Sequence, residues 1–170
     1  IKYDRHGIKV DDHMMTSVEG VYAIGDVVSR KQPKLTPVAE FEGQYLFNYL
    51  TGKTTQQITY PTIGQAAFTF PEVAKAGVNP DDVANDPQYR VKRIPLKYGS
   101  LYAGQNDQIS TLTLVFKDQQ LVGASEIGDY AADDINNFIP IIGLQIDSNE
   151  YRQKVMAIYP TLGDKVAGAL

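Results

Sequence analysis

The stretch that decides the fold is residues 16–26, which read TSVEGVYAIGD. Residues 21–24 are an apolar run, typical of a strand that is buried on both faces. The pair Gly25-Asp26 follows directly, and glycine allows both a sharp turn and a close approach to a ligand. Asp26 would then lie at the carboxyl end of a strand, where open α/β sheets bind ligands. We therefore expect a ligand-binding turn at Gly25 and Asp26.

A helix start follows nine residues after this turn, where residues 35–39 read LTPVA. Threonine is a good N-cap and proline suits the first helical position, so Thr36 and Pro37 predict a helix. Gly52 is placed to end that helix. A helix N-terminus offers unpaired N–H groups and partial positive charge. Leu35, Thr36 and Pro37 are therefore candidates for cofactor binding, together with Gly25 and Asp26.

The pattern changes after a polar segment at residues 53–62, which we interpret as a linker. Two strands separated by Asp118-Gln119 are expected to form a hairpin. The second half therefore predicts an α+β fold, an antiparallel sheet with helices toward its end. The expected strands are residues 66–70, 73–78, 89–98, 111–117 and 120–127; a short helix starts at Asn79, and the expected later helices are 133–146, 148–156 with Ser148 as cap, and one after Thr161.

Composition excludes several classes of function. The chain has 170 residues, 43% of them hydrophobic, and a net charge of −4, which predicts a packed core and no nucleic-acid partner. With no cysteine and with histidines only at His6 and His13, we expect no disulfide, no cysteine nucleophile and no metal site. The most apolar stretch, residues 138–144, is too short to span a bilayer. We expect no membrane partner and a cytoplasmic location.

The string at residues 16–26 resembles the second FAD-contacting motif of the pyridine nucleotide–disulfide oxidoreductases, the family of glutathione reductase and dihydrolipoamide dehydrogenase. The resemblance implies that Asp26 contacts the ribityl chain of FAD. The string at residues 35–39 resembles the helix start whose N-terminus points at the flavin ring in glutathione reductases. The family also implies NADH or NADPH as electron donor, a small-molecule substrate and a homodimer.

The resemblance continues through the second half, at residues 60–62, 68–78 and 121–124. It implies that residues 1–52 are the end of an FAD-binding domain and residues 60–170 a dimerisation domain. The chain starts at Ile1 and contains no Gly-x-Gly-x-x-Gly, so we expect a C-terminal fragment that alone neither binds FAD tightly nor reduces a substrate. A non-catalytic dimerisation module is the alternative. The helix expected at residues 133–146 is either an interface element or a core helix.

The end of the chain departs from the family pattern. Disulfide reductases of the family carry His-Pro-Thr-x-x-Glu, with the His as acid/base partner of the redox thiols, whereas residues 157–164 here read AIYPTLGD. Tyr159 and Asp164 therefore occupy the catalytic His and Glu positions. A phenol, with an ordinary pKa of about 10, is a poor general base at neutral pH. Tyr159 either donates a hydrogen bond or only fills space, and the electron acceptor could be a quinone, a metal species, oxygen or coenzyme A disulfide.

Overall fold

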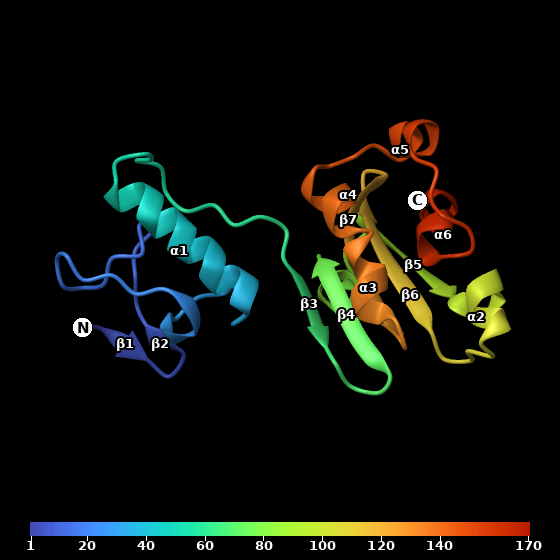
Figure 1. Cartoon of the computed structure of the whole chain (residues 1–170), viewed down its shortest axis with the longest axis horizontal. Coiled ribbons are helices and arrows are strands. Elements are labelled where there is room, and N and C mark those ends of the chain that lie inside the picture. Colours follow the sequence, from blue (N-terminus) through green and yellow to red (C-terminus); the bar gives the residue numbers. More distant parts are fainter. The chain divides into compact units, whose positions relative to one another are not determined.

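The computed structural model divides into two compact units, Ile1–Tyr60 and Pro61–Leu170 (Figure 1). It describes residues 1–99, 101–164, 166 and 168–170. No helix in this described part of the chain combines the length and the apolar composition needed to cross a membrane. Each unit has a hydrophobic core of its own.

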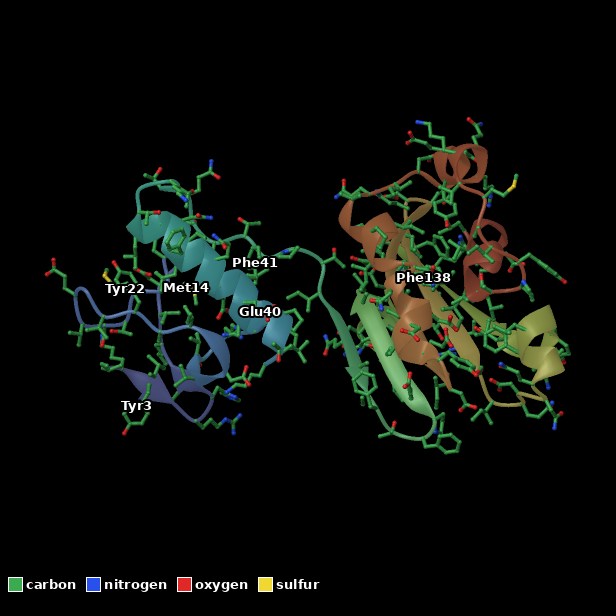
Figure 2. The ribbon with its side chains drawn as sticks, viewed as in Figure 1. Tyr3, Met14, Tyr22, Glu40, Phe41 and Phe138 are labelled. Atoms are coloured by element: carbon green, nitrogen blue, oxygen red, sulfur yellow. The ribbon has the colours of Figure 1, made fainter. Side chains whose placement is uncertain are left out.

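The first unit is a short hairpin, a long loop and one helix. Strands β1 (Tyr3–Asp4) and β2 (Gly7–Ile8) pair antiparallel. The 3-10 turn η1 (Gly25–Val27) precedes helix α1 (Thr36–Leu50). The core is built on Met14, Ala23 and Val28, against which residues of α1 and of the hairpin pack. Met14 is labelled in Figure 2. This small core leaves most of the unit near its surface.

The prediction of a buried strand at residues 21–24 is wrong, because the structure of this unit has no strand there. The backbone is extended, but it forms only one isolated bridge, between Met15 and Tyr22. Its hydrogen bonds run to one side, where the Thr16 N–H donates to Val21 O at 2.8 Å and the Ala23 N–H donates to Met14 O at 3.0 Å. A strand buried on both faces needs neighbours on both edges. Within residues 1–60, as the structure describes them, this segment is paired along one edge.

Helix α1 ends where predicted but begins slightly differently. Leu35 is the N-cap, because its carbonyl accepts the first helical bonds, from the N–H groups of Val38 and Ala39, both at 3.1 Å. Thr36 is already helical and makes no capping bond, so its assignment as the cap is wrong by one position. Gly52 follows the helix at φ +74°, a left-handed conformation that glycine adopts without strain, which confirms the predicted stop.

The second unit is an antiparallel five-stranded sheet in the order β3-β4-β7-β6-β5, which confirms the predicted α+β fold. The hairpin between β6 and β7 also forms as predicted, with Asp118 at φ 48° and Gln119 at φ 66°, as a type I′ turn requires. Strand β3 ends at Ala67, three residues earlier than expected. The strands are β3 (Gly64–Ala67), β4 (Glu72–Gly77), β5 (Tyr89–Pro95), β6 (Thr111–Lys117) and β7 (Gln120–Gly128).

The helix expected at residues 133–146 is broken into two, α3 (Ala131–Asn136) and α4 (Ile139–Gly143). Pro140 explains the break, because in a continuous helix its ring would collide with the carbonyl of Asn136 and it has no N–H to donate. Both helices contact β4 and β7. The other elements are η2 (Pro80–Val83), η3 (Leu96–Tyr98), α2 (Ser100–Gly104), α5 (Ser148–Lys154) and α6 (Leu162–Ala169).

One apolar core holds the second unit together. Phe138, between α3 and α4, is fully buried in it (Figure 2). Leu114 and Phe116 of β6 and Leu162 of α6 belong to the same cluster. The helices therefore share one hydrophobic face of the sheet. The opposite face is partly open, since Val73 and its register partner Ile127 are exposed.

Candidate functional site

The two halves of the predicted cofactor site lie together in the first unit. Gly25 opens the turn η1 at φ +73° and is buried, whereas Asp26 is exposed. A Cβ atom placed on Gly25 would lie 3.5 Å from the Cβ of Ala39, in the first turns of α1. The chain thus brings the turn against the N-terminal part of the helix.

The N-terminus of α1 is open to solvent. Leu35 is half-buried, and Thr36 and Pro37 are exposed. By helix geometry the Thr36 N–H has no intrahelical acceptor, and the partial positive charge of the helix is greatest there. An exposed helix N-terminus beside an exposed carboxylate provides both a donor and an acceptor for a polar ligand.

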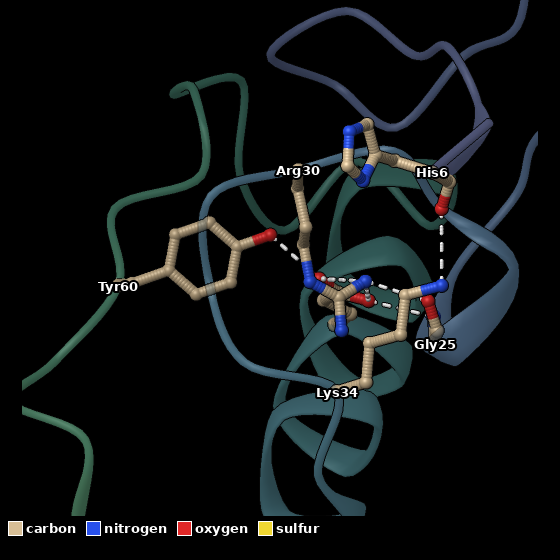
Figure 3. A network of polar contacts seen from close by, with 6 residues as sticks. His6, Gly25, Arg30, Lys34 and Tyr60 are labelled. Atoms are coloured by element: carbon tan, nitrogen blue, oxygen red, sulfur yellow. Dashed lines mark hydrogen bonds and ion pairs between the residues drawn. The ribbon is translucent and has the colours of Figure 1, made fainter. Parts of the chain in front are cut away.

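A buried polar network holds this turn from behind (Figure 3). Its centre is Glu42 of α1, whose side chain is 0% exposed. The Gly25 N–H donates to Glu42 Oε2 at 2.7 Å, and the Tyr60 hydroxyl donates to Glu42 Oε1 at 2.6 Å. Arg30 Nη1 lies 3.0 Å from both carboxylate oxygens. One carboxylate therefore joins three separate segments of the unit.

Arg30 is the cation of this network, and its side chain is only 6% exposed. Its Nη1 also donates to the carbonyl oxygen of Gly25 at 2.6 Å. Within the described residues, the buried Nε and Nη2 of Arg30 have no acceptor. Nearby, Lys34 Nζ donates to the His6 carbonyl at 3.0 Å (Figure 3). Two buried N–H groups of Arg30 therefore lie beside the turn without an acceptor among the described residues.

Tyr60 closes the network from the end of the unit. Burial raises the pKa of the Tyr60 hydroxyl above its ordinary value, and its hydrogen bond to Glu42 raises that pKa further. The hydroxyl therefore stays protonated and remains a donor to the carboxylate over the physiological pH range.

Sequence reasoning missed Glu42, Arg30 and Tyr60. One signal for Glu42 was present, because it stands four residues after Val38 and three before Tyr45, on the apolar stripe of α1. A charge at such a position is rarely left buried without a partner. Arg30 gives no such signal, since the residues around it, 29–34, are mostly polar and read as a loop.

The second unit contains its own buried acidic cluster. Glu126 of β7 is 2% exposed, and Asp134 of α3 lies beside it and accepts a hydrogen bond from the hydroxyl of Tyr102. Burial raises the pKa of Glu126, and the charge on Asp134 raises it further. Since two adjacent buried carboxylates cannot both ionise easily, the proton stays on Glu126 at neutral pH.

The predicted catalytic positions lie in the second unit. Tyr159 is in the loop between α5 and α6 and is 68% exposed. Asp164 is in the first turn of α6, where it lines a cavity of about 420 Å³ with Tyr98, Tyr102 and Leu162. Among the described residues, no three His, Asp or Glu side chains gather as metal ligands.

Known families match both units. The profile described as pyridine nucleotide-disulphide oxidoreductase matches residues 1–43. The profile described as the dimerisation domain of the pyridine nucleotide-disulphide oxidoreductases matches residues 63–170. The chain belongs to this family. The predicted family is therefore confirmed.

Relatives within the family differ in length. A 19.7 kDa protein of the mercuric resistance operon of Staphylococcus aureus is 29% identical, and the match covers 100% of this chain and 96% of that protein. Dihydrolipoyl dehydrogenase of Corynebacterium glutamicum is 28% identical over 98% of the chain, and glutathione reductase of Yarrowia lipolytica is 29% identical over 98%. The chain spans only 36% and 37% of these two enzymes.

Solved structures share the fold. LpdA from Mycobacterium tuberculosis superposes with a TM-score of 0.81 at 22% identity, over 96% of this chain and 36% of that one. RclA from Escherichia coli, an HOCl-induced flavoprotein disulfide reductase, gives 0.82 at 16% identity, over 98% of this chain and 38% of that one. At these identities the likeness establishes the fold alone.

Proposed function

We propose that this chain supplies part of the FAD site and the dimerisation domain of an FAD-dependent, NAD(P)H-using disulphide oxidoreductase. In this proposal residues 1–52 belong to the FAD-binding domain, residues 60–170 form the dimerisation domain, and the protein is cytoplasmic. The observation that carries the proposal is the Gly25-Asp26 turn, which packs against the start of α1 within a chain of this family.

The residues present fit a flavin. Gly25 has no side chain that would obstruct a close approach to the turn, and Asp26 offers an exposed carboxylate that can accept a hydrogen bond from a sugar hydroxyl. Behind the turn, the buried Nε and Nη2 of Arg30 lack acceptors among the described side chains and backbone groups. The start of α1, at Leu35, Thr36 and Pro37, directs partial positive charge outward. When bound, FAD carries the electrons between the nicotinamide donor and the acceptor.

Amide spectra of the chain under titration with FAD test this site. We expect weak binding, with chemical-shift changes at the amides of Asp26 and Thr36, because the chain holds only part of the site. ADP, which lacks the ribityl chain and the flavin ring, should leave both amides unshifted. Asp26→Asn should reduce the FAD effect, and Asp12→Asn, at another exposed carboxylate, should not. Equal shifts with ADP, or none with FAD, would overturn the proposal.

Homodimerisation is the second part of the proposal. The loop between α5 and α6 exposes several apolar side chains together, including Met156, which is 99% exposed, with Val155 and Ile158. Apolar segments of this kind mark protein interaction sites. Light scattering after size exclusion should give twice the mass of the chain. A monomer at all accessible concentrations would contradict this part.

The identity of residue 159 bears on the electron acceptor. Since Tyr159 stands at the position of the family's His, we propose that the whole protein does not turn over glutathione disulphide or lipoamide by the usual route. It would act instead on a quinone, a metal species, oxygen or coenzyme A disulfide. The test is an acceptor panel on the longest natural form of the protein. Efficient glutathione disulphide reduction that Tyr159→Phe leaves unchanged would refute it.

A non-catalytic dimerisation module is the second candidate. The observation that favours it is the staphylococcal relative, a 19.7 kDa protein that this chain matches along 96% of its length. This candidate predicts a dimer whose Asp26 and Thr36 amides do not respond to FAD. The titration and the mass measurement together separate the two candidates.

A further inference from the structure

The turn that faces the proposed flavin is fixed by a side chain that lies behind it. Asp26 is exposed, and its direction depends on the peptide of Gly25, which precedes it. Both polar groups of Gly25 are held: its N–H donates to Glu42 Oε2 at 2.7 Å, and its carbonyl accepts from Arg30 Nη1 at 2.6 Å. The conformation of the turn is thus set from the interior of the unit.

Glu42 is the centre of this hold. The same carboxylate keeps Arg30 in place, since Nη1 of Arg30 lies 3.0 Å from each of its oxygens. The hydrogen bond from Arg30 to the Gly25 carbonyl therefore also depends on Glu42. Hydrogen bonds to an ionised partner are shorter and stronger than neutral ones. Loss of the negative charge on Glu42 would directly weaken its hydrogen bond with the Gly25 N–H. It would also weaken the hydrogen bond from Arg30 to the Gly25 carbonyl, because Glu42 holds Arg30 in place.

A purely structural ion pair does not account for this arrangement. A buried ion pair is often no more stabilising than well-packed apolar side chains of the same volume. Here both carboxylate oxygens of Glu42 are bonded to Arg30, which holds the turn (Figure 3). One oxygen also accepts from the Gly25 N–H of the turn, and the other accepts from the Tyr60 hydroxyl. Within the turn itself, the Val28 N–H also donates to the Gly25 carbonyl at 3.1 Å, whereas the Gly25 N–H is bonded to Glu42. A glycine at φ +73° can adopt many other conformations, so the bond from Glu42 adds a constraint that the backbone bond alone does not supply.

We propose that Glu42 is the positioning residue of the Gly25-Asp26 turn, and that through Gly25 and Arg30 it sets the direction in which Asp26 meets a flavin. The inference rests on the proposed function, because only that function gives Asp26 a ligand. Glu42 itself touches no ligand, since its side chain is buried on the far side of the turn.

The test compares Glu42→Gln with Glu40→Gln in the full 170-residue chain. Glu40 lies close to Glu42 on the same helix and is exposed, so it is a matched control for loss of one negative charge. The first readout is amide hydrogen exchange. In Glu42→Gln, exchange at Gly25 should rise roughly tenfold or more, as expected when a charge-assisted hydrogen bond becomes a neutral one. Glu40→Gln should leave it unchanged.

An internal reference separates positioning from general destabilisation. The Ala23 N–H is bonded to Met14 O at 3.0 Å in the core of the same unit and does not touch Glu42. Positioning predicts that Gly25 accelerates more than Ala23. Equal acceleration of both amides, or no acceleration at Gly25, means that Glu42 is only a structural ion pair and overturns the inference.

The second readout is the response of the Asp26 amide to FAD in the same variants. Glu42→Gln should weaken this response, as Asp26→Asn does, while Glu40→Gln keeps it. If Asp26→Asn weakens the response and Glu42→Gln does not, the inference fails while the flavin site stands. If the unmodified chain shows no response, the flavin proposal fails and the inference fails with it, whatever the exchange at Gly25 shows.

Discussion

Glu126 shows what burial does to a single carboxyl group. Glu126 belongs to β7 and lies next to Asp134 of α3, which accepts a hydrogen bond from the Tyr102 hydroxyl. Glu72 and Asp107 are also near enough to raise the pKa of Glu126. The folded protein therefore binds a proton at Glu126 that the unfolded chain releases at a lower pH. By linkage, this group makes the free energy of unfolding fall as pH rises.

Glu126→Gln should remove this pH dependence. The folded pKa, raised to about 9, lies above the ordinary value of about 4.3, so the protein should lose stability progressively between those two pH values. Glutamine keeps the shape without the charge, and the variant should be the more stable one at pH 8. Urea unfolding across this range measures the effect, with the exposed Glu150→Gln as control. Parallel pH profiles for Glu126→Gln and the unmodified chain would show that Glu126 is not the group responsible.

At the same scale, the sequence reveals some site residues and hides others. Gly25 and Asp26 directly follow an apolar run, so the sequence alone indicates a turn there. The position of Glu42 on the apolar stripe of α1 indicates its burial, but its partners Arg30 and Tyr60 are distant in the chain, so no local pattern identifies them. When a charged residue interrupts the apolar stripe of a helix, it either stays in contact with water or is buried with a partner.

At the scale of single elements, helix caps decide where helices begin. Asp147 caps α5, and its Oδ1 accepts from the N–H groups of Asn149 at 2.9 Å and Glu150 at 3.0 Å. Ser148, the cap predicted from the sequence, is instead the first helical residue. Aspartate and serine are equally good caps, so the sequence alone does not choose between neighbours.

Asp147→Ala should therefore destabilise α5 by about 1 kcal/mol, because two N–H groups lose their acceptor. Ser148→Ala should change stability by only a few tenths of that amount, since alanine is a good helix former. Amide exchange at Asn149 and Glu150 measures the difference between the variants. A larger loss in Ser148→Ala than in Asp147→Ala would mean that the helix begins one residue later.

Elements with strong local signals match the sequence pattern best. The hairpin of β6 and β7 combines alternation with a two-residue turn, and its register, Lys117 opposite Gln120, follows from that turn. Pro140 indicates a break between α3 and α4, whereas the apolar spacing, which continues across it, predicts one helix. The strand expected at residues 21–24 depends on neighbours on both edges, which no single segment can supply.

At the scale of the whole molecule, the two units differ in the size of their cores. The first rests on Met14, Ala23 and Val28, and the second on a much larger cluster that includes Leu114 and Phe138. Small units bury a smaller fraction of their surface and are less stable for that reason. The assignment of residues 1–52 and 60–170 to two domains stays a prediction.

The first unit should therefore open before the second. In native-state hydrogen exchange under mild denaturant, the Ala23 amide should report a lower free energy of opening than the Leu114 amide, by about 2 kcal/mol or more. The second unit, expressed alone as residues 61–170, should stay folded. Identical opening free energies at the two amides would mean that the chain unfolds as one cooperative body.

Tyr60 also determines where the first unit can be separated from the second. Its hydroxyl is bonded to Glu42, so the chain is tied down up to this residue, and strand β3 starts at Gly64. Residues 61–63 lie between these two points. An exchange of second units among members of the family, whether by natural recombination or by design, would therefore keep a stable first unit only if the crossover falls after Tyr60; one placed earlier, in the polar stretch from residue 53, would discard a partner of the buried carboxylate.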